Sequence, residues 1–263
     1  MQLIGQPVKH NAFGKGIVTD LSSQMVTVQF SEGEKKFLYP QAFSSFLTLK
    51  NTDAQKAIND AYHQMLRAEK VQNQKKNAES ERRCRLRTMK LSANDQIAFD
   101  LAEESVQDVF SRGRIFMGEY LSGSTKGQPR QVTRLKPNSA VLLTQLPASG
   151  KEADRQITGI FMVPETFWGT QHQDGYVPVH QRFQLALSPA LALPYWDYVP
   201  SGKRVDRWGK IPFKYFSTRS TRDILRDIIV KLDPADPSGE QEQIQAFLQY
   251  FCTLNRLPEV RRI

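Results

Sequence analysis

Residues 51–90 contain neither proline nor glycine, and this constrains the fold of the 263-residue chain more than any other feature. Without a helix breaker the segment favours one long helix, and either Thr52 or Asp53 can cap its start. Apolar residues recur at helical spacing early in the segment; they are Ala54, Ala57, Ile58, Ala61, Tyr62, Met65, Leu66 and Ala68. We therefore expect three parts: a domain over residues 1–50, a helical linker over residues 51–90 and a domain over residues 91–263.

From residue 67 onward the same segment becomes polar and basic. Nine basic and three acidic residues lie between residues 67 and 90, a net charge of 9 − 3 = +6, whereas the whole chain carries +9. One interpretation is a solvated connecting helix. The other is a segment that follows phosphates, with an affinity that falls with salt and is indifferent to base sequence. On that interpretation the residues that bind DNA or RNA are Arg67, Lys70, Lys75, Lys76, Arg82, Arg83, Arg85 and Arg87.

The N-terminal residues show the pattern of short strands. Residues 25–30 alternate between apolar and polar side chains, residues 31–34 form a turn signal, and residues 37–39 read as the returning strand. Pro40 then begins a short helix that folds back over one end. So many short strands in so few residues predict a small closed or half-open β-barrel of the SH3 or Tudor type.

The spacing V-x-H-x-x-F-G-x-G-x-V, which runs from Val8 to Val18, carries a resemblance. Residues 8–47 resemble the Tudor-like domain at the end of superfamily 1 DNA helicases of the UvrD/PcrA kind. That resemblance implies an adaptor without chemistry of its own, which docks on protein partners of the transcription machinery through His10, Phe13 and Lys15. The alternative is that His10 and Phe13 only brace the barrel. The sequence contains no phosphate-binding loop, so no motor activity is implied.

Composition restricts the compartment and the partners. The sequence contains no apolar run long enough to cross a membrane, and its first residues lack the apolar core of a signal peptide. Cys84 and Cys252 are far apart and read as free thiols. We therefore expect a cytoplasmic protein with no membrane partner, whose positive charge favours a polyanion such as a nucleic acid.

The C-terminal residues alternate between strand and helix patterns. Strands are predicted at residues 97–101, 115–121, 140–145, 157–163 and 183–187, and helices at residues 102–112, 217–232 and 240–255. This order predicts an α+β domain with a curved mixed sheet and C-terminal helices. It resembles the PUA-like group, whose EVE and YTH domains read a base in an aromatic pocket. Residues 110–252 also resemble an uncharacterised bacterial family, which implies no activity.

All three tryptophans lie in an aromatic-rich segment between residues 161 and 216, with basic residues interleaved. Aromatic rings beside cations suit the binding of a base, nucleotide or peptide. Turn-forming residues surround two of the tryptophans, so we predict a pocket lined by Trp196, Tyr198 and Trp208, with Arg207 or Lys214 at its mouth. The alternative is that these rings fill the core.

Signals for catalysis are weak. Asp174, His180 and Asp197 fit no metal-ligand spacing. Asp154 and Arg155 precede a buried strand and are expected to form a structural ion pair. We therefore predict no catalytic residue, metal or cofactor. The sequence favours a non-enzymatic, nucleic-acid-associated adaptor; the alternatives are a defence-type nuclease or nucleotide hydrolase, and a pure protein-interaction module.

Overall fold

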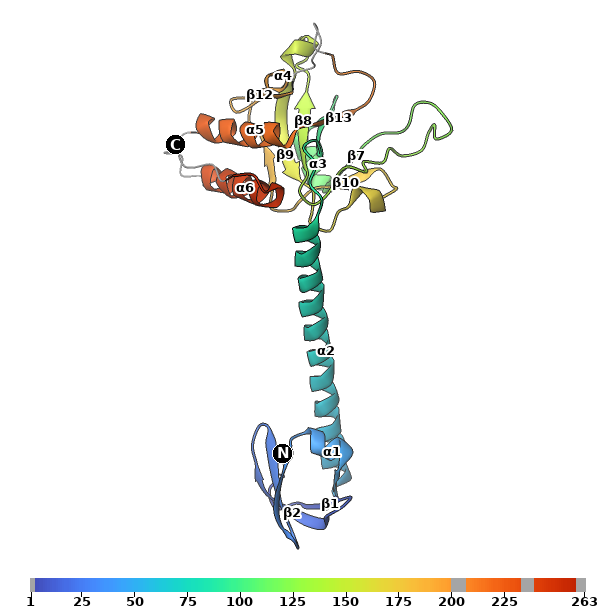
Figure 1. Cartoon of the computed structure of the whole chain (residues 1–263), viewed down its shortest axis with the longest axis vertical. Coiled ribbons are helices and arrows are strands. Elements are labelled where there is room, and N and C mark those ends of the chain that lie inside the picture. Colours follow the sequence, from blue (N-terminus) through green and yellow to red (C-terminus); the bar gives the residue numbers. More distant parts are fainter. Residues whose placement is uncertain (1–2, 200–206, 233–238, 259–263) are drawn as a thin grey trace. The chain divides into compact units, whose positions relative to one another are not determined.

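The computed structural model describes residues 3–199, 207–232 and 239–258 (Figure 1). Its contacts divide the chain into two compact units, Met1–Arg87 and Thr88–Ile263. Both units contain strands and helices, so the α+β class is confirmed. The division places the long helix with the N-terminal strands, whereas the sequence analysis treated that helix as a separate linker.

The N-terminal unit is built on an antiparallel sheet of five strands in the order β4-β3-β2-β1-β5. The strands are β1 (Pro7–His10), β2 (Gly14–Leu21), β3 (Met25–Phe30), β4 (Gly33–Leu38) and β5 (Leu47–Leu49), and α1 (Gln41–Ser45) lies between the last two. Among residues 3–87 no hydrogen-bonded pairing joins the edge strands β4 and β5, so a closed barrel is not observed.

Alternation within β3 explains how this sheet buries its core. Val26, Val28 and Phe30 are buried, as predicted from the period of two. Gly16 lies opposite Phe30, and a Cβ atom at that glycine would lie 2.8 Å from the phenylalanine ring and 2.7 Å from Val28. Glycine at this position therefore lets β2 approach the core closely.

The long helix α2 (Thr52–Thr88) is anchored to this sheet at its first turns. The Asn51 side chain accepts hydrogen bonds from the main-chain N–H groups of Asp53 and Ala54, at 3.0 and 3.1 Å. Asn51 is thus the capping residue, and the prediction of Thr52 or Asp53 was wrong by one or two positions. The Gln55 side chain accepts from the Leu49 N–H and donates to the Phe43 carbonyl, which ties the helix to the sheet.

The C-terminal unit contains a mixed sheet in the order β11-β9-β8-β6-β13, with β12 added beside β9. Its strands are β6 (Gln96–Asp100), β8 (Ala140–Gln145), β9 (Gln156–Met162), β11 (Gln184–Ala186), β12 (Leu193–Pro194) and β13 (Phe213–Phe216). Strands β6 and β8 are parallel, and the other neighbours are antiparallel. Strands β7 (Arg114–Phe116) and β10 (Tyr176–Pro178) form a separate two-stranded ribbon.

Each face of this sheet has its own hydrophobic core, because successive side chains of β6 point to opposite sides. Ala98 packs in the core that includes residues of α5 (Thr218–Lys231) and α6 (Glu240–Asn255). Ile97 and Phe99 pack in the other core, with α3 (Val106–Arg112) and the β7–β10 ribbon. Figure 1 shows α5 and α6 side by side in this unit.

Several predicted boundaries were wrong for local reasons. The helix predicted from residue 102 begins only at Val106, because Ser105 and Asp108 form a capping box. The strand predicted over residues 115–121 ends at Phe116, after which the chain enters a long loop (Figure 1). The aromatic run at α4 (Tyr195–Tyr198) forms one helical turn, which was not predicted. No helix among the described residues is long and apolar enough to cross a membrane.

Candidate functional site

The predicted nucleic-acid-binding residues all lie on α2. Only Ala54 and Ile58 of this helix are buried, and both belong to the core of the N-terminal unit. Beyond them the helix is largely exposed, and every predicted basic residue except the half-buried Arg82 is exposed. The exposed cations therefore lie along a part of α2 that buries no apolar side chain in the described structure.

Glu79 organises part of this basic stretch. Its carboxylate accepts from Arg82 at 2.8 and 2.9 Å and from Arg83 at 2.8 Å, one helical turn further along. The hydrogen bond from Arg82, followed by that from Arg83, lowers the pKa of Glu79 to about 2. Two of the eight predicted cations are thus committed to an internal pairing.

The predicted pocket tryptophans lie together, but inside the C-terminal unit. Trp196 is 8% exposed and Trp208 is 7% exposed, and both belong to the core that faces α5 and α6. The Lys214 ammonium lies 5.8 Å from the Trp196 ring centroid and 5.5 Å from that of Trp208. This burial corresponds to the core-packing alternative, in which a cation covers the edge of an aromatic core.

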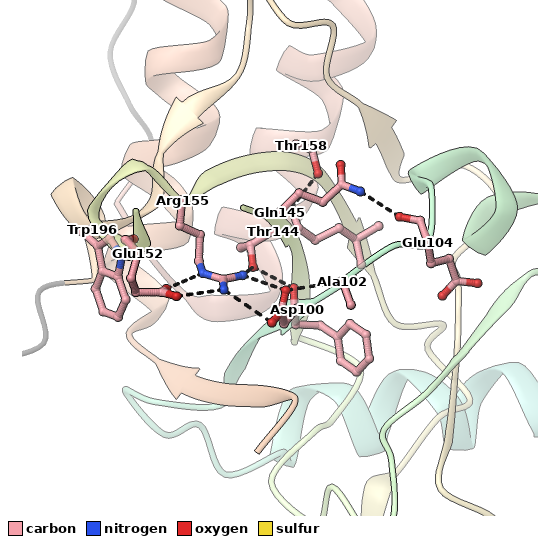
Figure 2. Close-up of polar contacts among 11 residues, drawn as sticks. Asp100, Ala102, Glu104, Thr144, Gln145, Glu152, Arg155, Thr158 and Trp196 are labelled. Atoms are coloured by element: carbon pink, nitrogen blue, oxygen red, sulfur yellow. Dashed lines mark hydrogen bonds and ion pairs between the residues drawn. The ribbon is translucent and has the colours of Figure 1, made fainter. Parts of the chain in front are cut away.

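Arg155 is the centre of the polar network beside these rings, and Figure 2 shows its guanidinium group between two carboxylates. Its nitrogens donate to Glu152 at 2.6 Å and to Asp100 at 2.7 Å. Burial alone would lower the pKa of Arg155, but these hydrogen bonds outweigh burial and raise it. The guanidinium carbon also lies 4.3 Å from the Trp208 ring centroid. Arg155 thus neutralises both acids and leaves neither as an unpaired carboxylate.

The expected ion pair between Asp154 and Arg155 was therefore wrong. The Asp154 carboxylate instead accepts a hydrogen bond from the Lys151 N–H at 2.7 Å, within the turn that precedes β9. Arg155 bonds to Glu152, one turn earlier, and to Asp100 on β6, two strands from β9 in the sheet, and adjacency in sequence does not reveal either partner.

The two remaining residues of the predicted pocket, Tyr198 and Arg207, lie in different environments. The Tyr198 hydroxyl donates to Asp227 at 2.6 Å. Burial, with the bond to Asp227, raises the pKa of Tyr198. Arg207 is exposed. A cavity of about 420 Å³ in the same unit is lined by other residues: Leu91, Ser92, Ala93, Ser217, Thr218, Arg219, Asn255 and Leu257.

His10 lies at the centre of an aromatic cluster in the N-terminal sheet. Its Nδ1 accepts from the Ala12 and Phe13 N–H groups at 2.9 and 3.2 Å, and its ring lies 4.7 Å from that of Phe13. Phe30, Phe37 and Phe46 also belong to the cluster, at 6.0, 5.1 and 6.1 Å from His10. His10 is buried and acts as a brace, whereas Phe13 is half-buried, and Lys15 and Phe46 are exposed.

Two of the three weak catalytic candidates, Asp174 and His180, have structural roles. Asp174 accepts the Tyr176 N–H at 3.2 Å. The Nδ1 atom of His180 accepts the Arg182 and Phe183 N–H groups at 3.0 and 3.1 Å, as His10 does in its own turn. Burial, and then the charge of Arg182, lowers the pKa of His180. Asp197 is exposed on α4. Among residues 3–199, 207–232 and 239–258, no group of three His, Cys, Asp or Glu could hold a metal ion.

The structure also brings together residues that the sequence analysis did not select. Arginine guanidinium groups of the C-terminal unit lie over tyrosine rings in three pairs of described residues: Arg114 over Tyr176 at 4.4 Å, Arg130 over Tyr120 at 4.9 Å, and Arg134 over Tyr215 at 4.7 Å. The partners are 10 to 81 residues apart in sequence, since 130 − 120 = 10 and 215 − 134 = 81. The sequence offers one local signal for this arrangement: in a strand, Arg114 and Phe116 lie on the same face because one residue separates them.

Comparison with known proteins adds no assignment to these residues. No protein-family model matches the sequence, and neither a curated protein nor a solved structure matches it. The function is therefore argued from the arrangement of the residues alone.

Proposed function

We propose that this protein is a non-enzymatic, nucleic-acid-associated adaptor in which α2 binds the phosphate backbone. The observation that carries this proposal is the exposed basic surface of α2. Arg67, Lys70, Lys75 and Lys76 project from a helix that buries only two side chains, Ala54 and Ile58. Beyond these two positions α2 has no buried apolar side chain among the described residues, and its row of cations attracts a polyanion.

The chemistry of this surface supports phosphate contacts more than base recognition. Lysine is a point charge on a flexible chain and fits phosphates without fixing a base. Each phosphate contact releases counterions and adds affinity that is independent of base sequence. We therefore propose binding to DNA or RNA with little sequence preference.

The N-terminal sheet supports the adaptor part of the proposal. We infer that the five strands form a half-open SH3-like or Tudor-like unit, and that Phe13 and Lys15 beside the His10 cluster contact a protein of the transcription machinery. Phe46 is 52% exposed next to this cluster, which would leave a large apolar ring in water unless a partner covers it. For the C-terminal sheet we propose the PUA-like class.

Substitution of the α2 cations tests the proposal. In a four-cation variant, Arg67, Lys70, Lys75 and Lys76 are each replaced by Gln, which retains helix propensity. A matched control replaces Lys151, Arg182, Arg219 and Lys231, which are exposed basic residues of the C-terminal unit, and so removes the same net charge. The readout is fluorescence anisotropy at fixed salt with two unrelated duplex sequences.

We expect the four-cation variant to bind both duplexes more weakly than the control, and by the same factor for each sequence. Equal weakening in the two variants would mean that net charge alone drives association, and α2 would lose its proposed role. Far-UV circular dichroism must show that α2 is still helical in both proteins.

The docking proposal has a separate test. Purified RNA polymerase is incubated with the wild-type protein and with a Phe13→Ala/Lys15→Glu variant, with and without nuclease treatment. Retention of the wild type after nuclease treatment, and its loss in the variant, is the expected result. Complete release by nuclease would show that nucleic acid bridges the two proteins and would overturn direct docking.

A further inference from the structure

The β7–β10 ribbon presents an aromatic and cationic outer face. Its inner residues, Ile115 and Val177, are buried in the core with α3. The alternate residues therefore point outward: Arg114 is exposed, and Phe116 and Tyr176 are half-buried with ring centroids 5.1 Å apart. Phe116 and Tyr176 are also direct partners in the ribbon register. The ribbon thus holds a ring pair at the surface with an arginine over one of them.

The loop that follows β7 extends this face. The chain leaves the ribbon and returns so that Arg130 N–H donates to the Gly118 carbonyl at 2.8 Å, and Arg130 then lies over Tyr120. A Cβ atom at Gly175 would lie 2.7 Å from Pro129 and 3.0 Å from the Phe116 ring. This close approach places the returning part of the loop, at Pro129, directly beside the ribbon.

The third pair joins the loop to the edge strand β13. Arg134 lies over Tyr215 of that strand. Burial raises the pKa of Tyr215, and the main-chain hydrogen bond and charge of Arg134 oppose this. We call the combined set the stacked-arginine surface, which consists of Arg114, Phe116, Tyr120, Arg130, Arg134, Tyr176 and Tyr215.

Some described arginines of this unit have their charge balanced by a carboxylate, whereas the three arginines of this surface do not. Arg155 and Arg112 form ion pairs with carboxylates. Among the described residues, no carboxylate forms an ion pair with Arg114, Arg130 or Arg134. Residues 114–134 contain four basic residues and one acidic residue, Glu119, a net charge of 4 − 1 = +3. Asp174 next to the ribbon is occupied by its own turn.

We propose that the stacked-arginine surface binds single-stranded nucleic acid, and this deepens and rests on the proposed nucleic-acid function. An arginine held over a ring is positioned before binding, and an N–H group that is not used by a carboxylate can donate to a phosphate. Half-buried aromatic rings can stack with bases that are unpaired. In a duplex the base faces are already stacked on each other, so the rings would have no partner there. The surface therefore selects single strands over duplexes.

The experiment compares single-strand and duplex affinity in the full-length protein. The variants are Tyr176→Leu, which keeps apolar volume but removes the flat ring, and Arg114→Gln. The matched control is Arg182→Gln, because Arg182 also lies over a ring, that of Phe183 in the opposite core. The probes are a labelled oligothymidylate, which does not self-pair, and a labelled duplex.

We expect Tyr176→Leu to weaken oligothymidylate binding by about 5- to 150-fold, the range for loss of one base-stacking ring, and to leave duplex binding unchanged. Arg114→Gln should weaken it less, and Arg182→Gln should have no effect. If both surface variants bind oligothymidylate as the control does, the proposal is overturned. Equal loss for the single strand and the duplex would also overturn it, since the surface would not discriminate.

The same measurements in the four-cation background separate this proposal from the function of α2. Single-strand binding that persists there, and is lost on adding Tyr176→Leu, supports the surface even if α2 makes no contact with phosphates. Single-strand binding that is abolished in that background, with no effect of Tyr176→Leu in the wild type, assigns all binding to α2 and excludes the surface.

Discussion

At the scale of single residues, burial favours the core-packing interpretation of the two tryptophans Trp196 and Trp208. Trp196 donates its indole N–H to the Glu152 carbonyl at 2.7 Å, and the Tyr195 ring packs against both indoles, at 4.8 Å from Trp196 and 5.3 Å from Trp208. Rings with such neighbours contribute to stability through buried area and edge-to-face contacts. A ligand pocket would need at least one of these rings to face solvent.

Replacement of either tryptophan by alanine is expected to lower the free energy of unfolding by about 3 to 5 kcal/mol, the cost of deleting a buried aromatic side chain. Arg207→Ala, at an exposed neighbour, should change it by less than about 0.5 kcal/mol. Urea denaturation measures both. Loss of stability below about 1 kcal/mol in both tryptophan variants, together with abolished ligand binding, would restore the pocket interpretation.

Arg155 is 3% exposed, and its removal would leave the carboxylates of Asp100 and Glu152 without their shared cation. We expect Arg155→Met to lower the free energy of unfolding by up to about 3 to 5 kcal/mol, at the lower end because both acids are about a quarter exposed. Asp100→Asn combined with Glu152→Gln should restore part of that loss. A double-mutant cycle by thermal denaturation checks this. Full stability of the single variant would contradict a structural role.

At the scale of elements, α2 is held by its cap and by charge pairs more than by packing. The pKa of Glu79 falls from 4.5 to about 2 because the carboxylate is bonded to Arg82 and Arg83. A lowered pKa means that the stabilisation is complete above pH 4.5 and is lost as pH falls towards 2. The Glu79 side chain is 41% exposed to solvent, so salt should weaken the effect.

The helicity of α2 should therefore decrease as the pH falls from 4.5 to about 2. The Glu79→Gln variant should not show the decrease that comes from protonation of Glu79. Glu69→Gln, at an acid of the same helix whose side chain is exposed, is the control. Circular dichroism at 222 nm, a standard helix band, is recorded at low salt. An identical pH profile in wild type and Glu79→Gln would contradict this pairing.

The sequence predicted the elements best where periodicity and chain breaks agree. The predicted bounds of β8 (residues 140–145) and α6 (residues 240–255) match those of the structure. A buried apolar run marks the first element, and apolar residues at helical spacing mark the second. Strands β10 and β12 were not predicted, since two or three residues are too few for a period to appear.

The site residues were harder to predict than the elements. Exposure of the α2 cations follows from local composition, so these positions could be selected from the sequence. The arginine–tyrosine pairs depend on contacts between distant segments, such as Arg134 and Tyr215, which no local pattern encodes. The turn residues around Trp196 and Trp208 indicated exposure, but tertiary packing places both rings in the core.

At the scale of the whole molecule, positive charge is concentrated rather than spread. Residues 67–90 carry a net +6 of the chain's +9, and residues 114–134 carry +3. The remaining residues therefore sum to 9 − 6 − 3 = 0. Such a distribution favours association with a polyanion at two defined segments of the chain. Because residues 67–90 carry the larger share of the charge, we propose α2 as the main electrostatic contact.

The salt dependence of duplex binding shows directly whether the cations of α2 contact phosphates. The logarithm of affinity is plotted against the logarithm of salt concentration for the wild type, the four-cation variant and the charge-matched control. We expect affinity for the duplex to fall less steeply with salt in the four-cation variant: the magnitude of its slope should be smaller by about 0.9 for each phosphate that its side chains no longer neutralise. The slope of the charge-matched control should stay near the wild-type slope. A four-cation variant with the wild-type slope would contradict the account.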